Sequence, residues 1–108
     1  MYVLIADDHD LVKDMIAAYL QVDGDTKVDS ASTLDGALDL INENGPYDLV
    51  LLDFTMPGMN GLEGMKKARI ANQDRPVGLI SGTADRSVAE DALNEGAAGF
   101  LPKTMPAK

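Results

Sequence analysis

The chain has 108 residues and a hydrophobic content of 45%, enough for one domain that buries roughly two-thirds of its unfolded surface. Its 18 acidic and 9 basic residues give a formal charge of −9, which argues against nucleic-acid binding by these residues, and the absence of cysteine excludes disulfides, thiolate metal sites and thiol nucleophiles. No apolar run approaches the roughly 20 residues of a membrane span and no signal peptide is recognisable, so we expect a cytoplasmic protein without membrane contact.

The first strand is predicted from the apolar run at 3–6, and helical spacing predicts a helix over 9–21. Asp8 or Asp10 can cap the free N–H groups at the start of that helix. The apolar residues at helical spacing, which we expect to face the core, are Leu11, Met15, Ile16, Tyr19 and Leu20.

A second strand around 27–31 is polar, which suits the edge of a sheet. Ser32 and Asp35 then stand at capping-box spacing ahead of a second helix, and Gly45-Pro46 ends it. The expected buried face of this helix consists of Leu34, Ala37, Leu38 and Ile41.

The most apolar run of the chain covers 47–53. Its four consecutive aliphatic residues indicate a parallel strand that is covered on both faces and central in the sheet. A helix over 62–72, with Leu62, Met65 and Ala68 on its apolar face, and a strand over 76–81 follow. A helix over 86–95 comes next, with Val88, Ala92 and Leu93 on its apolar face and Gly96 as its left-handed cap. The last element is a strand over 98–102.

Five strands joined by four crossover helices, with right-handed connections, predict a doubly wound α/β fold for a single domain over 1–108. Only residues 104–108 follow Lys103 at the end of the last strand, too few for a covering helix. We therefore expect one face of the sheet to lack part of its apolar cover, which favours a homodimer. We also expect the natural protein to continue beyond this chain.

Polar residues stand where four of the apolar runs end. They are Asp7-Asp8, Asp53, Ser81 and Lys103. The carboxyl ends of parallel strands share one rim of a sheet, and ligands bind at that rim near the point where strand order reverses. We expect these side chains to meet there.

Three gathered carboxylates need a counter-charge, because two unit charges about 4 Å apart repel by roughly 4 kcal/mol at an effective dielectric near 20. Lys103 supplies one positive charge. A divalent cation would supply the other two, and an all-oxygen donor set favours Mg²⁺ as that cation. Asp53 ends the central strand and is the expected nucleophile on phosphorus. Ser81 and Lys103 would bind phosphoryl oxygens.

Over almost the whole chain these residues resemble the response-regulator receiver domain of two-component signalling. The segments that carry the resemblance are Ala6-Asp7-Asp8, residues 53–61 (Asp-Phe-Thr-Met-Pro-Gly-Met-Asn-Gly), Ser81-Gly82 and residues 99–103 (Gly-Phe-Leu-Pro-Lys). The resemblance implies a flavodoxin-like sheet of five parallel strands in the order 2-1-3-4-5, as in chemotaxis receivers. It also implies a fifth helix, which is missing from this chain.

The resemblance implies that Asp53 accepts phosphate from a phosphohistidine on a sensor histidine kinase. Asp8, Asp53 and the backbone carbonyl of Thr55 would bind Mg²⁺, and Asp7 would join directly or through water. Such a domain is a regulatory phosphoacceptor rather than a turnover enzyme.

The same resemblance implies a two-state switch. The new phosphoryl group would draw Ser81 inward, Phe100 would turn into the vacated space, and the surface of the fourth helix and fifth strand would change. The sequence around Asp7-Asp8-His9 and over 99–104 most resembles that of receivers joined to LuxR-type helix-turn-helix regulators. DNA would then be bound only through an absent C-terminal domain.

His9 is the single histidine of the chain and follows the acidic pair. We expect a partly exposed residue of the first helical turn rather than a metal ligand, because a divalent site with histidine usually shows a second nitrogen ligand.

Four alternatives remain. The chain could be a stand-alone phosphorelay receiver, or an aspartate-nucleophile phosphatase, which commonly needs an acid two residues after the nucleophile, where Thr55 stands. A flavodoxin-like FMN binder is disfavoured because Asp7-Asp8 would repel the flavin phosphate. A degenerate receiver that signals without phosphate is disfavoured because no member of the charged set is missing.

Overall fold

The structure is a computed structural model that describes residues 1–22, 24–82 and 86–102. Each element lies within two residues of the bounds that the sequence predicts. In chain order the elements are β1 (Tyr2–Ala6), α1 (Asp10–Leu20), β2 (Lys27–Ala31), α2 (Leu34–Asn44), β3 (Leu49–Asp53), α3 (Leu62–Ala71), β4 (Val77–Ser81), α4 (Arg86–Asn94) and β5 (Phe100–Pro102).

The strands form a parallel sheet. Four strands of five residues stand in the order β2-β1-β3-β4, and the three-residue β5 extends the sheet beside β4. β3 lies between β1 and β4, and its Val50 and Leu52 are fully buried. The prediction of a central strand from an unbroken aliphatic run is therefore confirmed. β2, the polar strand, is an edge as expected.

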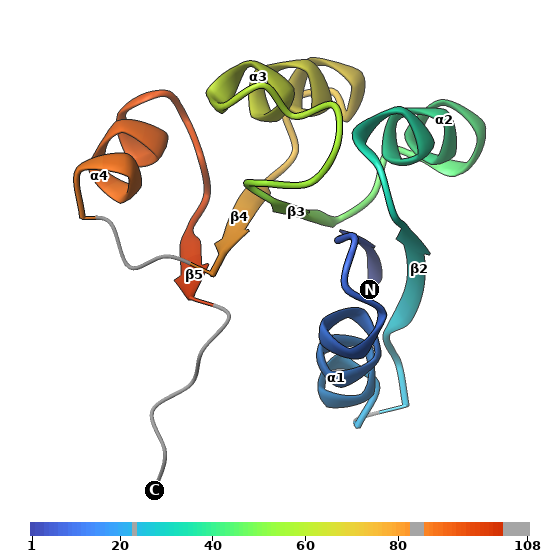
Figure 1. Cartoon of the computed structure of the whole chain (residues 1–108). Coiled ribbons are helices and arrows are strands. Elements are labelled where there is room, and N and C mark those ends of the chain that lie inside the picture. The colour runs from blue at the N-terminus through green and yellow to red at the C-terminus, as the bar shows by residue number, and fades with distance from the viewer. Residues whose placement is uncertain (23, 83–85, 103–108) are drawn as a thin grey trace, which may run out of the picture.

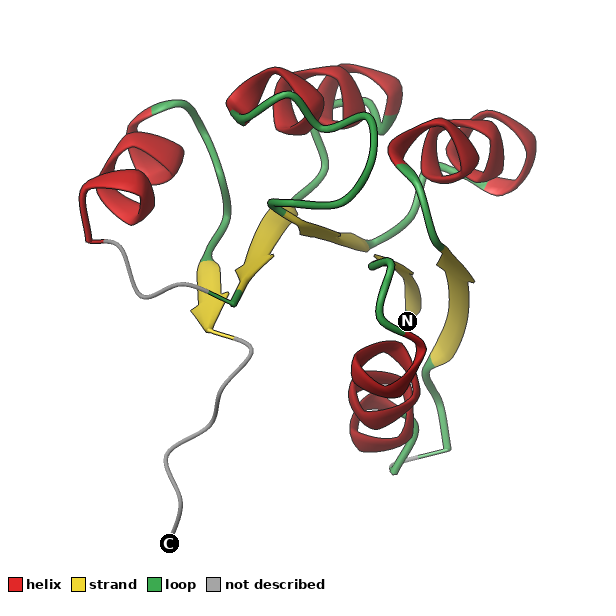
Figure 2. Cartoon of the chain, viewed as in Figure 1, coloured by secondary structure: helices red, strands yellow, loops and turns green. Residues whose placement is uncertain are grey.

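The helices divide between the two faces of the sheet. Helices α2, α3 and α4 lie on one face and α1 lies on the other (Figure 1), an arrangement that the red helices and yellow strands of Figure 2 also show. The larger core packs between the sheet and the three helices and includes Leu34, Ile41, Leu52, Met65, Ala68 and Leu79. The smaller core joins Val3, Ile5, Leu51 and Ile80 of the sheet to Ile16, Ala17 and Leu20 of α1. In the part of the chain that the structure describes, no helix has both the length and the apolar character needed to cross a bilayer.

The predicted core face of α1 is wrong for three of its five residues. Leu11, Met15 and Tyr19 are 73%, 57% and 80% exposed. They are spaced four residues apart and form one stripe, whereas α1 contacts the sheet through the neighbouring stripe of Ile16, Ala17 and Leu20. A single helix against a flat sheet buries only one of these stripes. Leu93, also predicted to be buried, is 51% exposed on α4.

Two helix starts differ from the prediction. His9 rather than Asp8 or Asp10 is the N-cap of α1, and its side chain makes no capping hydrogen bond. At α2 the N-cap is Thr33, whose Oγ1 accepts a hydrogen bond from the Gly36 amide at 3.0 Å. Ser32 instead accepts a hydrogen bond from Lys13 Nζ at 2.8 Å, which links α1 to the loop after β2.

The predicted left-handed cap of α4 is confirmed. Gly96 has φ of +105°, and its amide donates to the carbonyl of Leu93 at 3.1 Å. The amide of Ala97 donates to the carbonyl of Ala92 at 2.9 Å. These bonds satisfy carbonyl groups that the end of the helix would leave unpaired.

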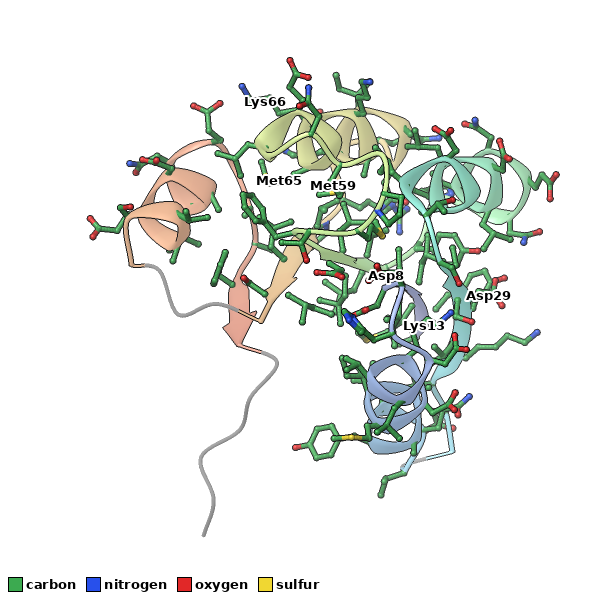
Figure 3. All side chains as sticks on the ribbon, viewed as in Figure 1. Asp8, Lys13, Asp29, Met59, Met65 and Lys66 are labelled. Carbon is green, nitrogen blue, oxygen red and sulfur yellow. The ribbon has the colours of Figure 1, made fainter. Side chains whose placement is uncertain are left out.

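A carboxylate inside the polar edge strand joins three segments. Asp29 of β2, labelled in Figure 3, accepts hydrogen bonds at Oδ2 from the phenols of Tyr2 at 2.5 Å and Tyr47 at 2.7 Å. Burial, and then this bond to Asp29, raises the pKa of Tyr47. Asp29 thereby links β2 to β1 and to the segment before β3. These hydrogen bonds explain why a charged residue lies in this strand.

The backbone before β3 is held by a buried amide side chain. Asn72, at the end of α3, accepts a hydrogen bond from the Tyr47 amide at 2.7 Å and donates one to the Tyr47 carbonyl at 3.0 Å. Both residues are fully buried. The pair therefore fixes the chain where it enters the central strand.

Replacing Asn72 with leucine should lower the free energy of unfolding by about 2 kcal/mol, because the buried N–H and C=O of Tyr47 would lose their partners. Urea denaturation followed by circular dichroism measures this loss. Asn42→Leu, the same exchange at an exposed position of α2, should change stability far less. Equal effects for the two variants would show that the Asn72 hydrogen bonds do not stabilise the fold.

Candidate metal centre

Three of the predicted site residues lie at one rim of the sheet. The register pairs Ala6 with Leu52 and Asp53 with Ile80, so that Asp7, Asp53 and Ser81 follow one another across the carboxyl ends of β1, β3 and β4. All three side chains are buried, with exposed fractions of 1% or less. The convergence expected from strand ends is therefore present for these residues.

The carboxylates form a compact cluster with one histidine. One ligand-type atom from each of Asp7, Asp8, His9 and Asp53 lies within 4.8 Å of the other three. Figure 3 places Asp8 in the loop after β1, beside the rim. Asp7 and Asp53 form the buried floor, while the side chains of Asp8 and His9 are 39% and 60% exposed. The cluster is thus open to solvent on the side of Asp8 and His9.

His9 lies closer to the acidic cluster than its sequence position indicated. Its Nδ1 is 3.1 Å from Asp7 Oδ1, 3.2 Å from Asp8 Oδ1 and 4.0 Å from Asp53 Oδ2. The backbone amide of His9 also donates to Asp7 Oδ1 at 2.8 Å. Sequence reasoning placed this residue in the first helical turn, but it is the N-cap, whose extended backbone turns the ring back toward the rim.

Asp53 is held in place by the loop that follows β3. The amide and the hydroxyl of Thr55 both donate to Asp53 Oδ1, at 3.1 and 3.2 Å. The amide of Phe54 donates to the Ile80 carbonyl at 2.8 Å and so continues the pairing of β3 with β4. One carboxylate oxygen of Asp53 is therefore fixed by the protein, and the other, Oδ2, is the atom 4.0 Å from His9 Nδ1.

Phe100, the predicted switch residue, belongs to β5. Phe100 pairs in register with Leu79, two positions before Ser81, and its partly buried ring packs against the larger core. Ser81 pairs with Pro102, the residue before Lys103. Lys103 itself lies outside the described residues, so its predicted place in the cluster is untested.

The donor set fits a hard divalent cation. Mg²⁺ binds oxygen at about 2.0–2.1 Å, which places opposite ligands of an octahedral ion about 4.2 Å apart and adjacent ones about 2.9 Å apart. Donor atoms that already lie within 4.8 Å of one another need only small movements to reach these distances. A cation would also offset the repulsion between carboxylates of which two are fully buried.

A second concave region does not compete with this site. A shallow pocket of about 330 Å³ is lined by Lys66, Arg69, Ile70, Asp74 and Glu95. Its cations already have partners, since Lys66 Nζ lies 2.6 Å from Glu95 and Arg69 Nε 3.6 Å from Asp74. Figure 3 shows Lys66 on α3, on the opposite side of the sheet from α1.

Comparison with known proteins agrees with this geometry. The family model for the response regulator receiver domain matches residues 3–108. The signal receiver domain of the putative response regulator NarL from Mycobacterium tuberculosis has a TM-score of 0.84 and 34% identity, over 97% of this chain and 85% of that one. The CheX-CheY-BeF₃-Mg²⁺ complex from Borrelia burgdorferi has a TM-score of 0.87 and 26% identity, over 98% of this chain and 80% of that one. The fold is therefore the flavodoxin-like receiver fold.

The curated relatives are longer proteins. The glycerol metabolism activator of Pseudomonas putida is 39% identical over 106 residues, which cover 96% of this chain and 48% of that protein. The chain spans about half the length of the curated relatives it matches, several of which are named as transcriptional regulatory proteins, among them MalR of Bacillus subtilis and the probable transcriptional regulatory protein NarL of Mycobacterium tuberculosis. The match over nearly all of its length, together with the fold, shows that this chain belongs to the family of response regulator receiver domains, the regulatory modules of two-component systems.

Proposed function

We propose that this domain is a phosphoacceptor in which Asp53 takes a phosphoryl group from a phosphohistidine of a sensor histidine kinase, in a reaction that requires Mg²⁺. The observation that carries the proposal is the placement of Asp53, which is fully buried at the end of the central strand and within 4.8 Å of the Asp7 and Asp8 ligand atoms. Asp53, Asp8 and Asp7 would hold the cation with the backbone carbonyl of Thr55. The bound cation would offset the negative charge that builds up as carboxylate and phosphoryl group approach.

The chain's own residues account for the transfer step. A carboxylate oxygen of Asp53 forms the new P–O bond while the P–N bond of the phosphohistidine breaks, and the departing imidazole nitrogen keeps the electron pair. Thr55 fixes the rotation of the Asp53 carboxylate through its two hydrogen bonds to Oδ1. Ser81 and Lys103 bind phosphoryl oxygens in this proposal, and the position of Ser81 beside Asp53 on the neighbouring strand supports its part.

The conformational change that follows phosphorylation would arise at the contact between β4 and β5. Phe100 and Ser81 lie two register positions apart on paired strands, so movement of Ser81 toward a phosphoryl group can open space for the Phe100 ring. The surface of α4 and β5 would change as a result. We propose that this change controls transcription through a DNA-binding segment outside this chain, because curated relatives of about twice its length are named as transcriptional regulators.

The exposed stripe of Leu11, Met15 and Tyr19 on α1 supports the separate proposal of a homodimer.

Incubation with acetyl phosphate tests the proposed function. In the presence of Mg²⁺ the intact mass should rise by one phosphoryl group per chain, and peptide mapping should locate it on Asp53. After removal of divalent cations with EDTA the uptake should fall at least about 100-fold, because the buried carboxylates then repel the donor. Uptake that does not depend on Mg²⁺, or a phosphoryl group on another residue, would contradict the proposal. Steady turnover of a phosphate ester would instead favour the phosphatase alternative.

A further inference from the structure

We propose that His9 is a fourth ligand of this metal centre, through Nδ1, and that it raises the preference of the site for first-row transition cations such as Zn²⁺ relative to Mg²⁺. The proposal rests on the proposed function only in that both use the cation site of Asp7, Asp8 and Asp53. It goes further, because it assigns a nitrogen donor and a metal preference to a residue outside the acidic set.

The distances around His9 Nδ1 fit ligands that share an ion, and the shortest of them also fits a hydrogen bond to Asp7. Two ligands at about 2.1 Å in a tetrahedral site lie about 3.4 Å apart. Nδ1 is 3.1 Å from Asp7 Oδ1 and 3.2 Å from Asp8 Oδ1, close to that separation. The third distance, 4.0 Å to Asp53 Oδ2, lies within 1 Å of it. An ion bound by the three carboxylates would therefore meet the imidazole nitrogen without rearrangement of the backbone.

The backbone holds His9 close to the acidic cluster. His9 is the N-cap of α1, with φ of −105° and ψ of 106°, and its amide is tied to Asp7 Oδ1 at 2.8 Å. Asp7 is fully buried, so the anchor itself cannot move far. The ring is 60% exposed, which leaves room for small rotations toward a bound ion and a path for the ion to enter.

The chemistry of the fourth donor sets the expected preference. Three carboxylates form a hard, all-oxygen site that suits Mg²⁺, whereas imidazole is a ligand that Zn²⁺, Co²⁺ and Ni²⁺ bind well and that Mg²⁺ rarely takes. Adding His9 should strengthen binding of the transition cations and leave binding of Mg²⁺ nearly unchanged. The competing explanation is that His9 only donates a hydrogen bond to Asp7 and has no contact with the ion.

Isothermal titration calorimetry separates these explanations. We expect His9→Ala to weaken Zn²⁺ binding about 10-fold or more while the Kd for Mg²⁺ changes less than about 3-fold. Asp10→Asn is the matched control, because this exposed carboxylate lies one residue further along and is paired with Lys13 Nζ at 3.1 Å. Asp10→Asn should have the same ratio of Zn²⁺ affinity to Mg²⁺ affinity as the parent. A His9→Ala variant with the parent's ratio would overturn the proposal.

A spectroscopic measurement needs no variant. His9 is the only histidine, so a sample labelled with ¹⁵N-histidine gives a single pair of ring nitrogen resonances. Saturation with Zn²⁺ should move the Nδ1 resonance to the position of a metal-bound nitrogen, and Mg²⁺ should not. If Zn²⁺ binds and the chemical shift of the Nδ1 resonance stays that of a nitrogen without a metal, His9 is not a ligand. If Mg²⁺ binds and supports phosphorylation while His9 has no effect, only this inference fails; if the parent binds neither ion, the proposed function fails with it.

Discussion

An Asp53→Asn variant is expected to take up no phosphoryl group from acetyl phosphate in the presence of Mg²⁺, a loss of at least about 10³-fold in rate. An amide oxygen is a far weaker nucleophile than a carboxylate oxygen, and the variant also removes one ligand of the cation. Intact-mass spectrometry over time measures the uptake. Asp35→Asn, the same exchange at an exposed position in the first turn of α2, should label at the parent's rate.

The same variant should be more stable than the parent when no divalent cation is present. The amide side chain introduced by Asp53→Asn keeps an oxygen that can accept both hydrogen bonds from Thr55, so the local geometry has no reason to change. The exchange removes one negative charge from a buried cluster, and we expect the free energy of unfolding to rise by about 1–2 kcal/mol. Added Mg²⁺ should narrow this difference by stabilising the parent.

Loss of uptake together with a gain of stability distinguishes a site residue from a residue that merely supports the fold. If Asp53→Asn were destabilised and bound less phosphate only in proportion to its unfolded fraction, the carboxylate would be structural. If it took up phosphate as the parent does, the acceptor would lie elsewhere in the chain.

The fold and the buried part of the site follow from short-range features of the sequence. The aliphatic run ending in Asp53 indicates a central parallel strand because a parallel strand covered on both faces typically has that composition. Once the strands are parallel, their carboxyl ends must share a rim, which brings Asp7 next to Asp53 and Ser81 beside it. No detail of packing is needed for that inference.

The errors come from features that depend on neighbouring elements. Periodicity identifies α1 as amphipathic, but which stripe is buried depends on what lies on that face of the sheet, and Leu11 and Tyr19 are exposed as a result. The N-caps depend on where a loop enters its helix, which is why Thr33 rather than Ser32 caps α2.

His9 illustrates the same limit at the site. Its adjacency to the acidic pair was visible in the sequence, yet the direction of its ring depends on the extended N-cap backbone and on the hydrogen bond to Asp7. A count of nitrogen ligands argues against a metal role, because histidine sites usually contain more than one. The distances to Asp7 and Asp8 argue the other way, and they carry information that composition does not.

An Asp8→Asn variant should separate cation binding from phosphoryl acceptance. Asp8 is the most accessible carboxylate of the cluster and makes no described hydrogen bond that holds the fold together. Its loss should weaken Mg²⁺ binding by about 100-fold or more, because even residues that only support a metal ligand contribute about 10–100-fold to affinity. Calorimetry measures the binding, and the same acetyl phosphate assay measures the consequence.

The dependence on Mg²⁺ concentration decides between the two roles. At low Mg²⁺ the Asp8→Asn variant should label slowly, and raising the concentration about 100-fold should restore much of the rate, because Asp53 is still present as the acceptor. Asp53→Asn should remain unlabelled at every concentration. Asp10→Asn, with its exposed carboxylate outside the cluster, should follow the parent curve. An Asp8→Asn variant whose Mg²⁺ dependence matched the parent would place the cation away from this rim and would leave the carboxylate cluster without its proposed purpose.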